Sequence, residues 1–120
     1  MGKIQIKRIY EPADKADGVR ILVDRLWPRG IKKEAAQIDD WMKAVAPSDS
    51  LRKLYHQGNA TWEAFEAKYI FELQQNTAVN DLLKVVNENP KVTLLYASRD
   101  EHQNHALVLL QFINKINQVI

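Results

Sequence analysis

The chain carries two short apolar runs. The first is Ile21-Leu22-Val23 within Arg20–Asp24, and the second is Val92–Ala97, where one threonine is the only polar residue. Runs of this length are typical of strands that are covered on both faces of a sheet. Lys3–Tyr10 instead alternates isoleucine with polar residues, which predicts a half-buried strand near the edge of the sheet.

Elsewhere, apolar residues recur every three or four positions, the period of an amphipathic helix. Four helices are predicted: one after an N-cap at Ser48, one after Asn59 or Thr61, one from Asn76-Thr77 to Asn89-Pro90, and one that runs from the end of the polar segment Ser98–His105 to about the C-terminus. Ile31–Ala46 has a weaker pattern. It is compatible with a short helix or turn around Lys33–Ile38 and with an extended piece at Trp41–Val45.

The order of these elements predicts the α/β class. A buried strand that is reached through helices favours parallel pairing with a right-handed crossover. With 120 residues the chain has room for one core. We therefore expect a small single-domain α/β sandwich over residues 1–120, with a mostly parallel central sheet and four to five helices.

The amino-acid composition excludes several kinds of site and cofactor. Without cysteine the chain has no disulfide, iron–sulfur cluster or thiol nucleophile. No apolar run approaches the roughly 18 residues of a membrane helix, and the N-terminus lacks the apolar core of a signal peptide. The three histidines, His56, His102 and His105, lack zinc spacing. We expect a cytoplasmic protein with no metal, no cofactor and no membrane partner. The sequence pattern does not indicate an oligomeric state.

Charged and polar residues follow both buried strands. Open α/β sheets bind ligands beyond the carboxyl ends of their strands. If the two strands are parallel neighbours, this edge of the sheet gathers the residues Asp24, Arg25, Arg29, Arg99, Asp100 and Asn104. The sequence therefore predicts a site at this edge.

Asp24 and Asp100 are the candidate catalytic carboxylates. Asp24 directly follows buried residues and needs a partner there, so it fits a general base or a group that orients a nucleophile. It fits equally well as a turn cap or as an ion-pair partner of Arg25 or Arg29. Asp100 with Gln103 resembles a capping box, which favours a structural role at the start of the last helix.

The candidate ligand-binding residues are Arg25, Arg29, Ser48, Arg52 and Asn104. Guanidinium groups bind carboxylate or phosphate in bidentate fashion, and free amides at a helix start also bind anions. The alternatives are structural ion pairs for the arginines, an N-cap role for Ser48 and a solvated position for Arg52. Glu72 is expected to pair with a loop arginine. Because the chain has four glycines and no phosphate-loop motif, side chains and a helix end would hold the anion.

The charge is unevenly distributed. Residues 1–33 hold nine Lys/Arg against four Asp/Glu, whereas the remainder holds eight against eleven. A basic first third predicts attraction to an anion, either a phosphate, a carboxylate or nucleic acid. A solvated basic face that pairs with the acidic remainder is the alternative.

Several motifs together resemble the YeaO-like group of bacterial proteins, a branch of a larger family defined as a domain of unknown function. They are Gly18–Gly30 with its Asp-Arg-Leu-Trp-Pro-Arg-Gly ending, Ala46-Pro47-Ser48 with Leu51-Arg52, Trp62-x-x-Phe65 with Tyr69-x-x-Glu72-Leu73, and Leu94–Ala97 continuing through Asp100 to Ala106. The resemblance implies a bacterial cytosolic protein but no reaction.

Two function classes fit these residues. The first is a small enzyme or binding protein that acts on an anionic small molecule, such as a nucleotide or a sugar phosphate, held by arginines at the carboxyl ends of the strands. The alternative is a nucleic-acid-associated or regulatory binding module that uses the basic N-terminal third. The predicted helices between Ser48 and Asn89 carry more acidic than basic residues, which disfavours a basic recognition helix.

Overall fold

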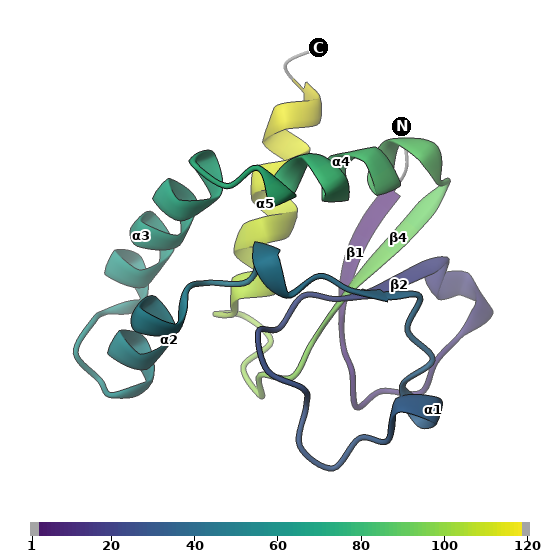
Figure 1. Ribbon diagram of the computed structural model, residues 1–120, viewed down its shortest axis with the longest axis horizontal. Coiled ribbons are helices and arrows are strands. Elements are labelled where there is room, and N and C mark those ends of the chain that lie inside the picture. Colours follow the sequence, from purple (N-terminus) through teal and green to yellow (C-terminus); the bar gives the residue numbers. More distant parts are fainter. Residues whose placement is uncertain (1–2, 119–120) are drawn as a thin grey trace.

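The computed structural model describes residues 3–118, which contain one four-stranded parallel sheet in the order β1-β4-β2-β3 (Figure 1). The strands are β1 (Lys3–Arg8), β2 (Val19–Leu22), β3 (Asp40–Trp41) and β4 (Lys91–Tyr96). The prediction of an α/β fold with a parallel sheet is confirmed. β1 lies at one edge, as its alternating pattern predicts, and β4 lies inside the sheet, where both of its faces are covered.

The described residues form five α-helices: α1 (Lys33–Ala36), α2 (Asp49–His56), α3 (Trp62–Gln74), α4 (Ala78–Glu88) and α5 (His105–Gln118). The predicted N-caps of α2 and α3 are confirmed. Ser48 Oγ accepts from the Leu51 amide, and Thr61 Oγ1 accepts from the Ala64 amide. In Figure 1, α2 and α3 lie side by side as a pair on the left, and α5 stands between this pair and the strands β1 and β4.

Several boundaries differ from the prediction by one or two residues, and two regions differ in a way that matters for the fold. β2 ends at Leu22, so Val23 and Asp24 lie just beyond the strand, although the Val23 amide still donates to Leu95 O. In Ile31–Ala46 the predicted short helix is present as α1. The predicted extended piece at Trp41–Val45 is reduced to the two-residue strand β3. The chain turns into a 3-10 helix at Lys43–Val45, which buries Val45 in the core.

The two faces of the sheet carry separate apolar clusters. Ile21 and Val23 contribute to the larger cluster with α3, α4 and α5, whereas Leu22 contributes to a smaller one. This alternation follows from the pleat of a strand, in which successive side chains point to opposite faces. The smaller cluster contains Ile9, Leu22, Ala36 and Leu95, with Trp27, Ile31, Ile38, Trp41 and Ala97 packed against it.

Gly18 allows β2 to enter the sheet beside β4. Its φ is +66°, and a Cβ there would lie 2.3 Å from Lys91 O. Only glycine fits this position without strain or clash. The entry sets the register Val19↔Val92 through Leu22↔Leu95, so both strands end at the same edge. The segments that follow β2 and β4 therefore meet there.

Candidate functional site

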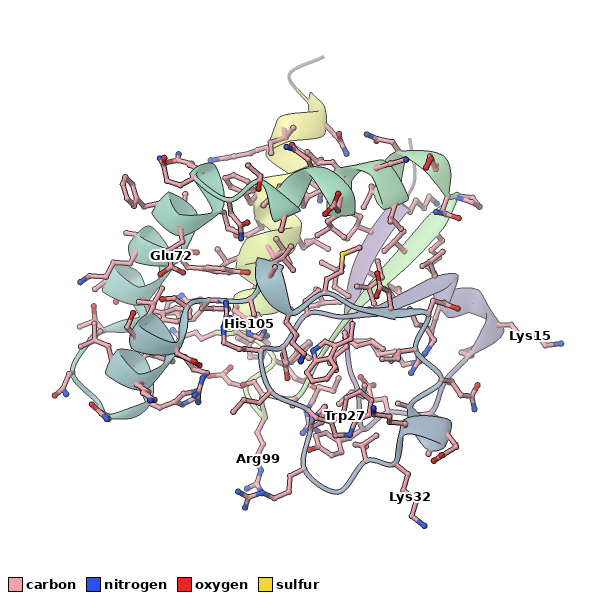
Figure 2. The ribbon with its side chains drawn as sticks, in the orientation of Figure 1. Lys15, Trp27, Lys32, Glu72, Arg99 and His105 are labelled. Carbon is pink, nitrogen blue, oxygen red and sulfur yellow. The ribbon has the colours of Figure 1, made fainter. Side chains whose placement is uncertain are left out.

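A cavity of about 410 Å³ lies at the edge where β2 and β4 end. Its wall is formed by the segments after these two strands and by residues of α2 and α3. Five of the seven candidate site residues line it: Asp24, Arg25, Arg29, Arg52 and Asn104. Small-molecule sites commonly occupy roughly 300–1,000 Å³, so the cavity is large enough for a small ligand. Figure 2 shows His105 near the centre of the molecule and Arg99 at its periphery.

Ser48 lies outside the lining, because an internal carboxylate uses its polar groups. The Ser48 amide donates to Glu72 Oε1 at 2.9 Å, and its hydroxyl donates to Glu72 Oε2 at 2.6 Å. Glu72 thus takes the place that an anion at the start of α2 would occupy. The expectation that Glu72 pairs with a loop arginine is wrong, since no arginine in residues 3–118 lies within 4.0 Å of its carboxylate.

Asp100 also lies outside the lining, and its carboxylate is exposed. Asp100 Oδ1 accepts from the backbone amides of Gln103 and His102, each at 2.9 Å. These two hydrogen bonds lower the pKa of Asp100 below its ordinary value. The predicted bond to Gln103 is present, but Asp100 does not cap α5. Asn104 does so, because its Oδ1 accepts from the Leu107 amide.

Arg25 connects the segment after β2 to the segment before α2. Its Nε donates to Pro47 O at 2.8 Å, and its Nη2 donates to Ala46 O at 3.2 Å. No carboxylate in the described part of the chain lies within ion-pair distance of Arg25 or of the exposed Arg29. The alternative in which Asp24 pairs with either arginine is therefore wrong. These two of the three cavity arginines therefore lack a paired carboxylate within residues 3–118.

Arg52 is incompletely paired. Its Nη2 lies 3.4 Å from Asp49 Oδ1, on a side chain that is 62% exposed. Its Nε is buried and has no hydrogen-bond partner among the described residues. A buried donor without a partner costs stability, so this guanidinium is better suited to a further acceptor than to its present surroundings.

Asp24 and His105 form a pair at the inner end of the site. Asp24 Oδ2 accepts from the Ala97 amide at 2.9 Å, which ties the end of β2 to the segment after β4. Asp24 Oδ1 lies 3.0 Å from His105 Nε2, but no donor in residues 3–118 is aligned for a hydrogen bond to it. His105 Nε2 is instead aligned with Val23 O, also at 3.0 Å.

Sequence reasoning missed the part that His105 plays here, because it weighed the histidines only as zinc ligands. The available signal was positional. His105 follows Asn104 at the end of the polar segment after β4, so the argument that placed Asn104 at this edge applies equally to it.

The sequence also left aromatic residues out of the site. Tyr55, Trp62 and Phe65 were not among the candidate site residues, yet all three line the cavity. Their ring centroids lie 4.8–5.9 Å apart, and Tyr55 and Trp62 are half-buried. We call these three residues the aromatic wall. It offers flat apolar surface beside the guanidinium groups.

Residues 3–118 contain neither a metal-binding cluster nor a membrane-spanning helix. That stretch contains no group of three His, Asp or Glu side chains placed to hold a metal ion. It also contains no helix with the length and apolar character needed to cross a membrane.

Comparisons with known proteins place the whole described chain in one family. A family model described as "Inactive DUF488-N3 subclade" matches residues 3–118. The chain is 43% identical to the uncharacterized protein YeaO of Escherichia coli K12, over 94% of this chain and 98% of the relative. It is 38% identical to an uncharacterized protein of Mycobacterium tuberculosis H37Rv, over 93% and 94% of the two chains. No solved structure matches significantly. The predicted membership of a YeaO-like family is confirmed.

Proposed function

We propose that this chain, which belongs to the inactive DUF488-N3 subclade, binds a small organic anion such as a nucleotide or a sugar phosphate in the cavity beyond β2 and β4. One observation carries the proposal. Arg25, Arg29 and Arg52 line a single cavity, and within residues 3–118 the only carboxylate paired with any of them is the exposed Asp49. Positive charge that is gathered in a concave site without internal neutralisation favours an anionic ligand.

The three arginines have different roles in this proposal. Arg52, whose side chain is 30% exposed, and the exposed Arg29 contact the anion through guanidinium N–H groups. Arg25 is already bound to two backbone carbonyls. It therefore contributes its charge and holds the wall in place.

Binding is favoured over catalysis. The family description calls the subclade inactive. Asp24 Oδ2 accepts from the Ala97 amide, and Asp24 Oδ1 is buried 3.0 Å from His105 Nε2, so Asp24 fits a positioning role better than that of a free general base.

Thermal unfolding in the presence of candidate anions tests the proposal. The probes are inorganic phosphate, ribose 5-phosphate, adenosine 5′-monophosphate and a short duplex DNA, each with the wild type, Arg29→Ala and Arg52→Met. Lys53→Met is the matched control, because Lys53 is exposed on the same helix and does not line the cavity. A ligand present at 100 times its Kd stabilises the native state by about 2.7 kcal/mol.

We expect at least one small phosphate to raise the Tm of the wild type and of Lys53→Met, and to do so much less for the two arginine variants. If no small phosphate shifts the Tm, or if the arginine variants respond like the wild type, the proposal is overturned. A shift with DNA alone would support the nucleic-acid alternative instead.

A further inference from the structure

The surroundings of His105 determine which of its ring nitrogens carries a proton. Nε2 lies 3.0 Å from Val23 O and 3.0 Å from Asp24 Oδ1. Both neighbours are acceptors, so a lone pair on Nε2 would face two other lone pairs. Nε2 therefore carries the hydrogen and donates it. The Ala97 amide holds the Asp24 carboxylate in place for this contact.

The other ring nitrogen, Nδ1, is left free. The only side-chain hydrogen bond of His105 within residues 3–118 is the one at Nε2. In that part of the chain, the buried polar side-chain atoms without a partner are Asp24 Oδ1 and Arg52 Nε alone, so the unpaired Nδ1 retains exposed surface. The ring also packs edge-on against Tyr69, with the ring centroids 6.3 Å apart, which fixes its orientation beside the cavity that it lines.

The cavity thus offers groups of opposite hydrogen-bonding character. Guanidinium groups can only donate. Nδ1 of a neutral imidazole with its proton on Nε2 can only accept. A ligand that matches both carries an oxyanion at one end and a hydroxyl group at the other.

The following inference rests on the proposed function. We propose that the ligand is a phosphorylated sugar whose phosphate binds Arg52 and Arg29 and whose hydroxyl donates to His105 Nδ1. A free sugar phosphate and the ribose phosphate of a nucleotide share this chemistry. Asp24 acts as a positioning residue in this proposal, since its carboxylate lies beside Nε2 and leaves Nδ1 of this cavity-lining ring for the ligand. The aromatic wall lies beside the same space and accommodates a base if one is attached.

The first experiment measures the ring of His105 directly. Nitrogen-15 chemical shifts of the histidine side chains at pH 8 report which nitrogen is protonated. We expect the Nε2–H form for His105 in the wild type and a rise in the Nδ1–H form in Asp24→Asn. Asp100→Asn is the matched control, because its carboxylate lies outside the cavity, and it should leave the ring unchanged. An Nδ1–H or doubly protonated ring in the wild type overturns the proposal.

The second experiment compares two phosphates by titration calorimetry. Ribose 5-phosphate has hydroxyl groups, whereas ethyl phosphate has the same charge and none. We expect the wild type to bind ribose 5-phosphate about tenfold more tightly, the worth of one well-placed hydrogen bond. His105→Phe should reduce this ratio to about one, and His102→Phe, at an exposed position outside the cavity, should keep it.

The outcomes separate this inference from the proposed function. If both phosphates bind the wild type equally, the hydroxyl contact is wrong while anion binding stands. If neither binds, both are wrong. The wild-type comparison decides this even if His105→Phe fails to fold.

Adenosine 5′-monophosphate identifies the source of the sugar phosphate. If it binds more tightly than ribose 5-phosphate and Trp62→Leu removes this difference, the ligand is a nucleotide. If the two compounds bind equally, the ligand is a free sugar phosphate. Both results support the proposed sugar-phosphate chemistry.

Discussion

Two charged clusters in this molecule differ in how completely their groups are paired. The first, which we call the closed cluster, consists of Lys7, Asp17 and Arg20. The Asp17 carboxylate accepts from Lys7 Nζ and Arg20 Nη1. Arg20 also donates to Gln37 O and Ala36 O, at 3.0 and 2.9 Å. Asp17 and Arg20 are only 3% and 5% exposed, and no polar side-chain atom of the cluster is buried without a partner.

The second cluster lines the cavity and remains incomplete. Asp24 Oδ1 and Arg52 Nε lack aligned partners, and Arg25 and Arg29 lack carboxylates in the described part of the chain. Buried polar groups that serve stability alone are normally satisfied. This difference is what we expect if the closed cluster holds the fold together and the cavity cluster binds the proposed ligand.

The largest expected effect is the loss of Arg20 from the closed cluster. Arg20→Met leaves the buried Asp17 without one partner and two carbonyls without their donor. It should lower the free energy of unfolding by about 3–5 kcal/mol, the usual cost of breaking a buried ion pair. Urea unfolding measures this. Arg52→Met is the comparison, with an expected loss within about 0.5 kcal/mol. Equal losses in both variants would remove the distinction between the clusters.

The order of the two variants should be reversed for ligand affinity, with the larger loss in Arg52→Met and the smaller loss in Arg20→Met. Arg52→Met should weaken binding of ribose 5-phosphate by about 1.5–3 kcal/mol, because a charged donor to the phosphate is lost. This corresponds to at least about a tenfold rise in Kd. Titration calorimetry measures the change, with Lys53→Met as the control on the same helix. Wild-type affinity in Arg52→Met would show that this guanidinium does not contact the ligand.

Stability at low pH should depend on the Asp17 carboxylate of the closed cluster. Burial raises the pKa of Asp17, but hydrogen bonds from the Asp14 amide, Lys7 and Arg20 together outweigh it and hold the pKa below its ordinary value of 3.8. A lowered folded-state pKa adds stability that is present above the unfolded-state value and is lost as the pH falls through the folded-state value. Stability should therefore fall below about pH 4. Asp17→Asn should show a shallower fall in urea unfolding measured from pH 5 to pH 2, and an unchanged slope would contradict this assignment.

The smallest effect is expected at Asp100. Because Asp100→Asn alters an exposed turn outside the cavity, it should change the Kd for ribose 5-phosphate by no more than about twofold. The pKa of Asp100 is lowered by the two backbone amides that it accepts from, so a small loss of stability at neutral pH is expected. A large loss of affinity in this variant would restore Asp100 to the site.

The sequence was sufficient to predict which edge of the sheet gathers most of the candidate residues. The two apolar runs identified the inner strands, and the polar residues after each run identified the edge at which they end. Parallel pairing then brought Asp24, Arg25 and Asn104 to one cavity, as the register of β2 with β4 shows. These inferences need only local patterns and the general geometry of α/β sheets.

The pairing of side chains could not be predicted in the same way. His105 contacts Val23 across 82 positions of sequence, and Glu72 reaches Ser48 across 24. Such contacts depend on where helices pack, which no local pattern encodes. The α5 cap illustrates the limit, since both Asp100 and Asn104 precede the helix and only its true start selects Asn104.

The most direct test of the central claim is to titrate ribose 5-phosphate into the nitrogen-15-labelled protein and map the shifted backbone amides. Ligand binding in the cavity predicts shifts concentrated in residues 24–30, 52–56 and 103–105, which lie in or next to the lining. Shifts confined to Lys32 and Lys33 at the start of α1, or no saturable shifts at millimolar ligand, would contradict the claim.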